Sequence, residues 1–144
     1  MITQVLPIKV PECWDVAKPG VHAIARKNSL PVDKLSVELF KRCCAGVMQL
    51  WLLVDGDGVI GFLITELSTD NILETRALNI YLLYAYRAIP KEVVEEGKAA
   101  LNAFAKANSC IWITFTTDTP DVITVVSKWW PGWELRPALR RAVA

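Results

Sequence analysis

The segment "VMQLWLLVDGDGVIGFLITELS" (47–68) constrains the fold more strongly than any other part of the chain. Two apolar runs flank the sequence "DGDG" (55–58), whose Asp-Gly steps favour the positive φ angles of tight hairpin turns. Neither run reaches the roughly 18 apolar residues that a membrane-spanning helix needs. The segment therefore predicts a β-hairpin in a folded globular domain.

The rest of the chain alternates between helical and extended patterns, so one α/β domain is expected over residues 1–144. Four strands are expected in addition to the two of the hairpin, at 3–10, 73–87, 110–116 and 132–144. Helices are expected at 11–29 (broken at Pro19-Gly20), 31–46, 90–109 and 119–130. The order β-α-α-β-β-β-α-β-α-β predicts a mixed, mostly antiparallel central sheet flanked by helices.

Individual residues set several of these boundaries. Pro7 inside the first strand predicts a position at the edge of the sheet, because proline cannot donate to a strand pair. Asp33 or Ser36 is expected to start the second helix, and Gly46 to end it. Pro90 is expected at the first position of the helix 90–109.

Charge and cysteine content narrow the classes of function. The net charge of +1 supplies no global field that would attract nucleic acid or anionic lipid. The start "MITQVLPIKV" lacks the pattern of a secretion signal, so a secreted or membrane location is not expected. The four cysteines form no C-x-x-C pair and are expected to be reduced, with Cys110 in the core.

The single histidine, His22, limits metal and hydrolase chemistry. A zinc site is not expected with one histidine and scattered cysteines. The "DGDG" turn lacks the further ligands of an EF-hand, so no metal site is expected there either. A Ser-His-Asp or Cys-His site would need His22, which is far in sequence from suitable partners.

The element order and several segments resemble the GNAT N-acetyltransferase superfamily over nearly the whole chain. The resemblance depends on the hairpin, on "LNIYLLYAYR" (78–87) followed by a helix, and on "VITVVSKWWPGWEL" (122–135). It implies a GNAT-like fold. It also implies that a loop of the form Q/R-x-x-G-x-G/A after the fourth strand would hold the pyrophosphate of acetyl-CoA on backbone N–H groups.

The corresponding loop here, in "YRAIPKEVVEEG" (86–97), departs from that form. Arg87 matches the first position, but Pro90 replaces a glycine and is expected to remove a donor. Glu92 is at the sixth position, and Glu95 and Glu96 add negative charge that would repel a phosphate. The sequence therefore favours a helix start without a bound ligand.

The resemblance also indicates which residues would act if the protein is an enzyme. Tyr84, Arg87 and Lys91 are candidate contacts to acetyl-CoA. Glu66, at the end of the second hairpin strand, is the candidate base, with the alternative that it is only a solvated carboxylate. The helix 119–130 lacks the tyrosine that the family often uses, and Ser127 is the remaining candidate to orient the thiol.

A cluster of tryptophan and arginine residues follows near the C-terminus. Such residues are enriched at protein interfaces, and they also stack on nucleic-acid bases or pack in a core, so three interpretations stay open. The net charge of only +1 disfavours binding to nucleic acid. The candidate interface residues are Trp129, Trp130, Trp133, Arg136 and Arg140.

These observations together predict a GNAT-fold protein without catalysis or cofactor that acts by binding protein, as a homo-oligomer or within a larger assembly. The rhythm of residues 81–118 is similar to GNAT-like proteins encoded among structural genes of tailed bacteriophages, which implies a cytoplasmic or virion location. One alternative is an acetyl-CoA-dependent N-acyltransferase with an atypical loop. A second is a phage-encoded inhibitor or anti-defence protein.

Overall fold

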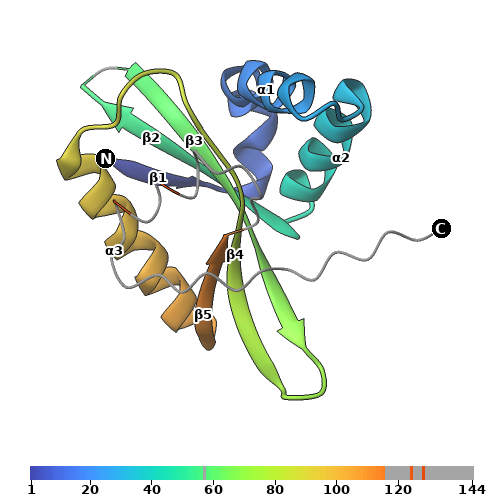
Figure 1. Cartoon of the computed structure of the whole chain (residues 1–144), viewed down its shortest axis with the longest axis vertical. Helices are drawn as coiled ribbons and strands as arrows, with labels where there is room; N and C mark the ends of the chain where they lie inside the picture. The colour runs from blue at the N-terminus through green and yellow to red at the C-terminus, as the bar shows by residue number, and fades with distance from the viewer. Residues whose placement is uncertain (57, 116–123, 125–127, 129–144) are drawn as a thin grey trace.

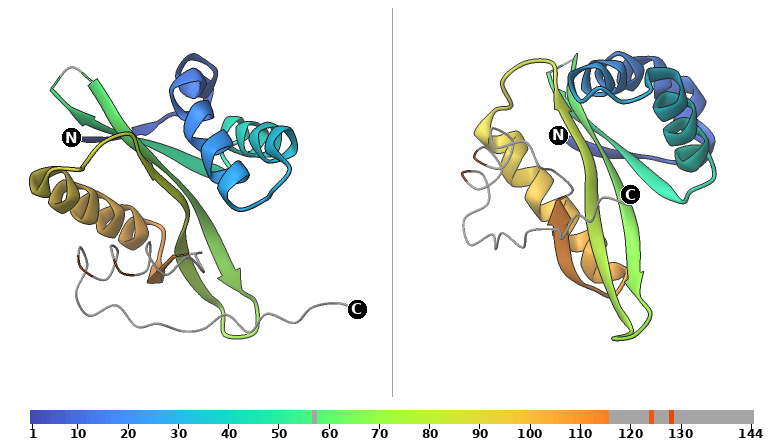
Figure 2. Two further views of the ribbon diagram at one scale, coloured as in Figure 1. Left: turned by 45° about the horizontal axis from the view of Figure 1, so that its top comes forward. Right: turned by 45° about the vertical axis from the view of Figure 1, so that its right-hand side comes forward.

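The computed structural model describes residues 1–56, 58–115, 124 and 128. These residues form a five-stranded sheet with three α-helices packed against it (Figures 1 and 2). The strands are β1 (Ile2–Val5), β2 (Met48–Asp55), β3 (Gly58–Asp70), β4 (Thr75–Ala85) and β5 (Cys110–Phe115). The helices are α1 (Val10–Lys27), α2 (Val32–Cys44) and α3 (Lys91–Ala107), with a short 3₁₀ helix at Pro7–Lys9.

The strands lie in the order β1-β2-β3-β4-β5. Neighbouring strands are antiparallel except β4 and β5, which are parallel and joined through α3. A parallel pair needs such a crossover, whereas antiparallel neighbours are joined by turns. The predicted α/β class with a mixed, mostly antiparallel sheet is confirmed.

The predicted hairpin is present as β2 and β3. Gly56 has a φ of +62°, a value that glycine adopts without steric cost. The register shifts by one residue between Leu53 and Val54, so a bulge lies just before the turn. β3 extends to Asp70 and therefore passes through Glu66, which is in the interior of the strand and not at its end.

Described helices lie on both faces of the sheet. α1 and α2 lie side by side on one face and α3 lies on the other (Figure 2). Fully buried Leu50, Phe62 and Ile64 belong to the cluster under α1 and α2. Trp51 and Leu78 belong to the cluster under α3. The alternation of Leu50 and Trp51 between clusters follows the period of two in a β-strand.

Two predictions near the N-terminus need correction. The first strand ends at Val5, because Pro7 begins the 3₁₀ helix, although β1 does lie at the edge of the described sheet. α1 continues through Pro19 and is not broken there. Ala17 and Val21, on either side of Pro19, are fully buried against the sheet, and this packing offsets the hydrogen bond that the proline removes.

The prediction for the C-terminal end of α2 is confirmed, and the prediction for its N-terminal end is wrong. Gly46 has a φ of +74° directly after the helix. Its N–H and that of Val47 bond to the carbonyls of Cys43 and Arg42, which is the pattern of a Schellman motif. At the other end Pro31 is the N-cap, and neither Asp33 nor Ser36 caps the helix.

Two further observations concern cysteines and helix lengths. All four cysteines are free, and Cys110 is half-buried against the core under α3. In the part of the chain that the structure describes, no helix has the length and apolarity needed to cross a bilayer.

Candidate functional site

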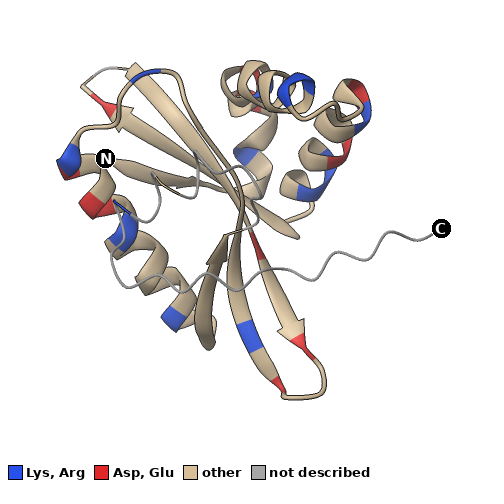
Figure 3. Ribbon diagram, in the orientation of Figure 1, with Lys and Arg blue, Asp and Glu red and all other residues tan. Residues whose placement is uncertain are grey.

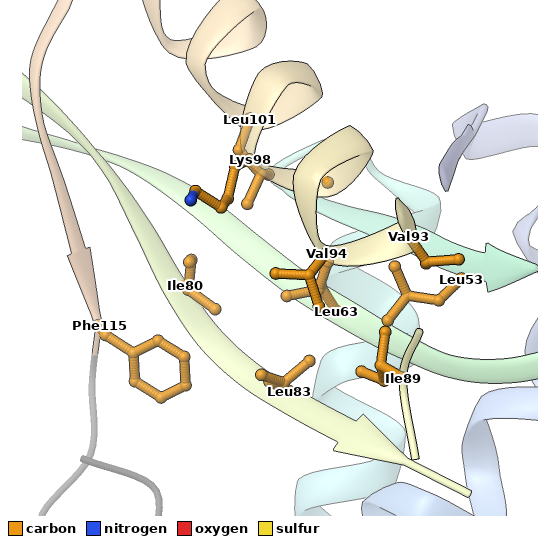
Figure 4. Close-up of a pocket in the computed structure, with 11 residues that line it drawn as sticks. Leu53, Leu63, Ile80, Leu83, Ile89, Val93, Val94, Lys98, Leu101 and Phe115 are labelled. Carbon is orange, nitrogen blue, oxygen red and sulfur yellow. The ribbon is translucent and has the colours of Figure 1, made fainter. Parts of the chain in front are cut away.

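The site is formed where β4 and β5 part. The two strands pair from Arg76–Cys110 to Ile80–Phe115, and β4 then continues to Ala85. Beyond Ile80 the pairs of β4 with described residues are made with β3 alone. Figure 4 shows β4 and β5 diverging toward their C-terminal ends. Such a gap between parallel neighbours leaves room for an extended ligand.

A bulge in β4 coincides with this parting. Thr65 pairs with Ile80 and Ile64 pairs with Leu82, so Tyr81 has no register partner on β3. A bulge bends a strand and increases its local twist. The extra residue therefore accompanies the change of direction of β4 away from β5.

An apolar cavity of about 60 Å³ lies at this place, between α3 and the sheet. Ile80 and Leu83 line it from β4, Phe115 from β5, and Val94 from α3 (Figure 4). Lys98 is the charged residue among the described residues of the lining. The lining suits an apolar chain that enters beside a single positive charge.

The N-terminus of α3 follows β4, and Val93 and Val94 of its first turns line the same cavity. Pro90 is the N-cap of α3 and has no side-chain capping bond. No described residue accepts a hydrogen bond from the N–H of Lys91, Glu92 or Val93. These donors and the positive end of the helix dipole favour an anion.

This geometry corrects the expected role of Pro90. The proline was expected at the first helical position, where its ring would replace a donor. It precedes that position by one residue, since the carbonyl of Pro90 accepts the N–H of Val94. The donors of Lys91, Glu92 and Val93 are therefore intact, although Pro90 itself still supplies no N–H to the loop.

The charges around α3 also differ from the expectation (Figure 3). Glu95 is paired with Lys98 at 3.3 Å, and Glu96 with the N-terminal ammonium of Met1 at 3.2 Å. Two of the three carboxylates that were expected to repel a phosphate thus have cationic partners. Exposed Glu92 has no ion-pair partner among the described residues.

Arg87, the candidate at the start of the loop, reaches the β2–β3 hairpin. Its Nη2 lies 3.0 Å from Oδ2 of Asp55, and both side chains are substantially exposed. Exposed pairs of this kind contribute at most about 1 kcal/mol. A phosphate could therefore replace Asp55 as the partner of Arg87 at small cost.

Aromatic side chains fix the position of the loop on the other face of the sheet. The N–H of Tyr86 donates to Ile60 at 2.8 Å, and its hydroxyl donates to the carbonyl of Val16 in α1. Burial raises the pKa of the Tyr86 phenol, Tyr84 acts in the same direction, and a backbone hydrogen bond at Gly20 lowers it. The start of the loop is thus held to α1.

Tyr84, a candidate cofactor contact, packs in this aromatic group. Its ring lies 5.3 Å from that of Tyr86 and 6.1 Å from that of Phe62, measured between centroids. Tyr84 belongs to the cluster under α1 and α2, whereas the cavity lies on the α3 face. Its role in binding stays a prediction.

Glu66 takes part in a hydrogen-bonded row across three strands. Asn79 Nδ2 donates to Glu66 Oε1 at 3.1 Å, and Thr114 Oγ1 donates to Asn79 Oδ1 at 2.9 Å. Leu78 and Ile80, on either side of Asn79, face α3, so the row is on the opposite face. Glu66 is half-buried and oriented, which differs from a solvated carboxylate at a strand end.

The bonds from Asn79 to Glu66 and from Thr114 to Asn79 were not predicted from the sequence, which gave Glu66 alone as the candidate base. They join strands whose register no local pattern specifies. Among the described residues, no group of three or more metal-ligating side chains is found. The remaining candidates lie outside the described residues: Ser127, Trp129, Trp130, Trp133, Arg136 and Arg140.

No protein-family model matches the chain, and no curated protein sequence matches it. Solved structures do match its fold. A probable acetyltransferase superposes with a TM-score of 0.74 and 15% identity, covering 100% of this chain and 97% of its own. An aminoglycoside acetyltransferase from an uncultured soil metagenomic sample, in complex with sisomicin, gives 0.71 and 13%, with coverages of 100% and 95%.

A third structure is a ribosomal-protein-alanine N-acetyltransferase from Brucella melitensis biovar Abortus 2308. It superposes with a TM-score of 0.69 and 14% identity, covering 100% of this chain and 99% of its own. At these identities the similarity concerns the arrangement of helices and strands. The chain therefore has the GNAT-like α/β fold that acetyltransferases share.

Proposed function

We propose that the protein is an acyl-CoA-dependent N-acyltransferase with an atypical pyrophosphate loop. The observation that carries this proposal is the divergence of the described ends of β4 and β5 (Figure 4), on the face of the sheet where α3 begins without a side-chain cap. An anion site next to an opening between strands matches a ligand that has a pyrophosphate at one end and an extended arm ending in a thioester at the other. The acetyltransferase names of the similar structures support the same activity.

The residues present fit such a ligand in two respects. The N–H groups of Lys91, Glu92 and Val93 would hold the pyrophosphate, with the Lys91 ammonium as a further partner. Ile80, Leu83 and other apolar residues would contact the methylene groups of the extended arm. The cavity of about 60 Å³ must widen for this, so side chains along it would have to move.

The row on the other face would serve the acceptor amine. Coenzyme A would supply an acyl group as a thioester. Glu66 would accept the proton that the amine loses when its nitrogen bonds to the acyl carbon and the thiolate leaves. The amide of Asn79, 3.1 Å from Glu66, would keep one carboxylate oxygen in place and leave the other free for the amine.

The test is calorimetric titration of the full chain with acetyl-CoA. We expect micromolar binding that Lys91→Glu weakens by about tenfold or more, since the change reverses a charge beside the phosphates. Lys34→Glu is the matched control, because it makes the same change in the first turn of α2, and it should leave the affinity unchanged. Replacing both Pro90 and Glu92 with glycine should increase the affinity.

A second candidate is a GNAT-fold protein that binds another protein and does not catalyse. It is favoured by the absence of glycine between Arg87 and Glu96 and by the Arg87–Asp55 pair, which occupies the arginine. If neither the wild type nor the double glycine variant binds acetyl-CoA, this candidate replaces the enzyme. The protein partner and the phage setting stay predictions, and light scattering of the purified chain would test for self-association.

A further inference from the structure

The groove between α1 and α2 has the dimensions and lining of a ligand site. Its volume is about 300 Å³, at the lower end of the range for small-molecule pockets. Buried Trp14 and Ser36 form its base, and exposed Lys18 and Asp33 border it. The rings of Trp14 and Phe40 stand 5.5 Å apart, so they form an aromatic surface at one end.

His22 lines the same groove, one helical turn after Lys18. Its Nε2 is buried and has no hydrogen-bond partner among the described residues. The ring lines the groove, but this nitrogen is closed off from it, so a ligand in the groove would contact other atoms of the imidazole.

The groove does not have the arrangement of a hydrolase site, although it contains the residue types. His22, Asp33 and Ser36 all line it, but no hydrogen bond joins any two of them. A serine nucleophile needs a base within hydrogen-bond distance. The polar groups are therefore available for binding a ligand.

The two charged side chains that border the groove have no ion-pair partner among the described residues. Lys18 is on α1 and Asp33 is on α2, and neither forms an ion pair with a described residue. They border one groove without pairing with each other. A ligand that has both a negative and a positive group could satisfy the two at once.

We propose that the groove between α1 and α2 binds a small zwitterion with an apolar side chain, of the chemical class of free α-amino acids. The carboxylate lies toward Lys18 and the ammonium toward Asp33. The apolar side chain rests on the rings of Trp14 and Phe40, and the imidazole of His22 lies beside the ligand. This site does not depend on the acyltransferase activity and lies on the helices, away from the cavity at β4 and β5.

The only histidine of the chain is inside the proposed site, so its imidazole resonances report on occupancy. The full chain is titrated with L-leucine while these resonances are followed by NMR. A saturable shift is expected. Asp33→Asn and Lys18→Met should each weaken binding by about tenfold, the effect of losing one charge-assisted hydrogen bond.

Matched controls use the same substitutions outside the groove. Glu38→Gln and Lys34→Met change exposed residues of α2 that do not line the groove, and both should leave the affinity unchanged. All four positions are exposed, so the variants should fold, and their unchanged methyl spectra would verify this. Equal losses in the controls would overturn the proposal.

Two derivatives test the charges of the ligand. N-acetyl-L-leucine lacks the ammonium and L-leucine amide lacks the carboxylate, and each should bind about tenfold more weakly than L-leucine. The proposal is wrong if either derivative binds as well as L-leucine. It is also wrong if L-leucine at roughly 10 mM leaves the His22 resonances unshifted.

Discussion

Two glycines in helix interiors show how differently the two faces of the sheet are packed. A Cβ on Gly20 of α1 would overlap the ring of Phe62 and would lie 2.7 Å from Cδ1 of Tyr84. A Cβ on Gly97 of α3 would meet only Ile2, at 3.8 Å. α1 thus lies directly against the sheet, whereas α3 stands further off.

The difference has a functional meaning. The tight face gives the strands a fixed support, because close-packed interiors resist displacement. The looser face contains the cavity beside Gly97, next to the donors of the α3 N-terminus. The proposed acyl-CoA site between α3 and the sheet would need this room on one face and rigidity on the other.

The largest expected effect is the difference in stability between two variants in which phenylalanine is replaced by alanine. Phe62 is fully buried on the tight face, and Phe62→Ala should lower the free energy of unfolding by about 4 kcal/mol. Phe115 is half-buried at the cavity on the looser face, and Phe115→Ala should cost roughly 1–2 kcal/mol. Urea denaturation of both variants measures the two values. Equal losses would show that the faces do not differ in packing.

The next prediction concerns the two glycines. Replacement by alanine should raise stability on one face and lower it on the other. Gly97→Ala should stabilise the protein by about 0.5–1 kcal/mol, the gain in helix propensity. Gly20→Ala has the same gain but forces Phe62 and Tyr84 to move, so a net loss of about 1–2 kcal/mol is expected. Thermal and urea unfolding would measure both. Stabilisation by Gly20→Ala would refute the close packing of α1.

Local signals in the sequence predicted much of the fold. The Asp-Gly turn, Gly46 and the apolar run of β4 each carry their conformation in a few residues, and the structure confirms all three. Pro19 misled the prediction because the buried residues that hold α1 together contact distant strands. Tertiary contacts of that kind have no local signature.

The candidate site depended on details finer than a sequence pattern provides. The place of Pro90 at the N-cap, one residue before the expected position, changed which N–H groups of α3 are free. The partners of Glu95 and Glu96 became visible only in the folded chain. The row from Glu66 to Thr114 requires the register of three strands, which sequence alone did not give.

The smallest expected effect concerns two cysteines, one on each face. Cys43 is buried on the tight face, and burial together with the neighbouring Cys44 raises its pKa from 9.0 to about 12. Between these values the unfolded chain loses the thiol proton while the folded chain keeps it. The contribution of Cys43 is therefore zero below pH 9, and stability falls as the pH rises from 9 to 12.

The slope should be roughly 1 kcal/mol per pH unit in that window, and Cys43→Val should reduce it. Urea denaturation at pH 7, 9 and 10 measures the slopes, provided that a reductant keeps the thiols free. Because buried Cys43 is shielded, Cys110 should also react faster with iodoacetamide in the folded protein. If Cys43 reacts as fast, the cluster under α1 opens readily, and the contrast between the two faces is lost.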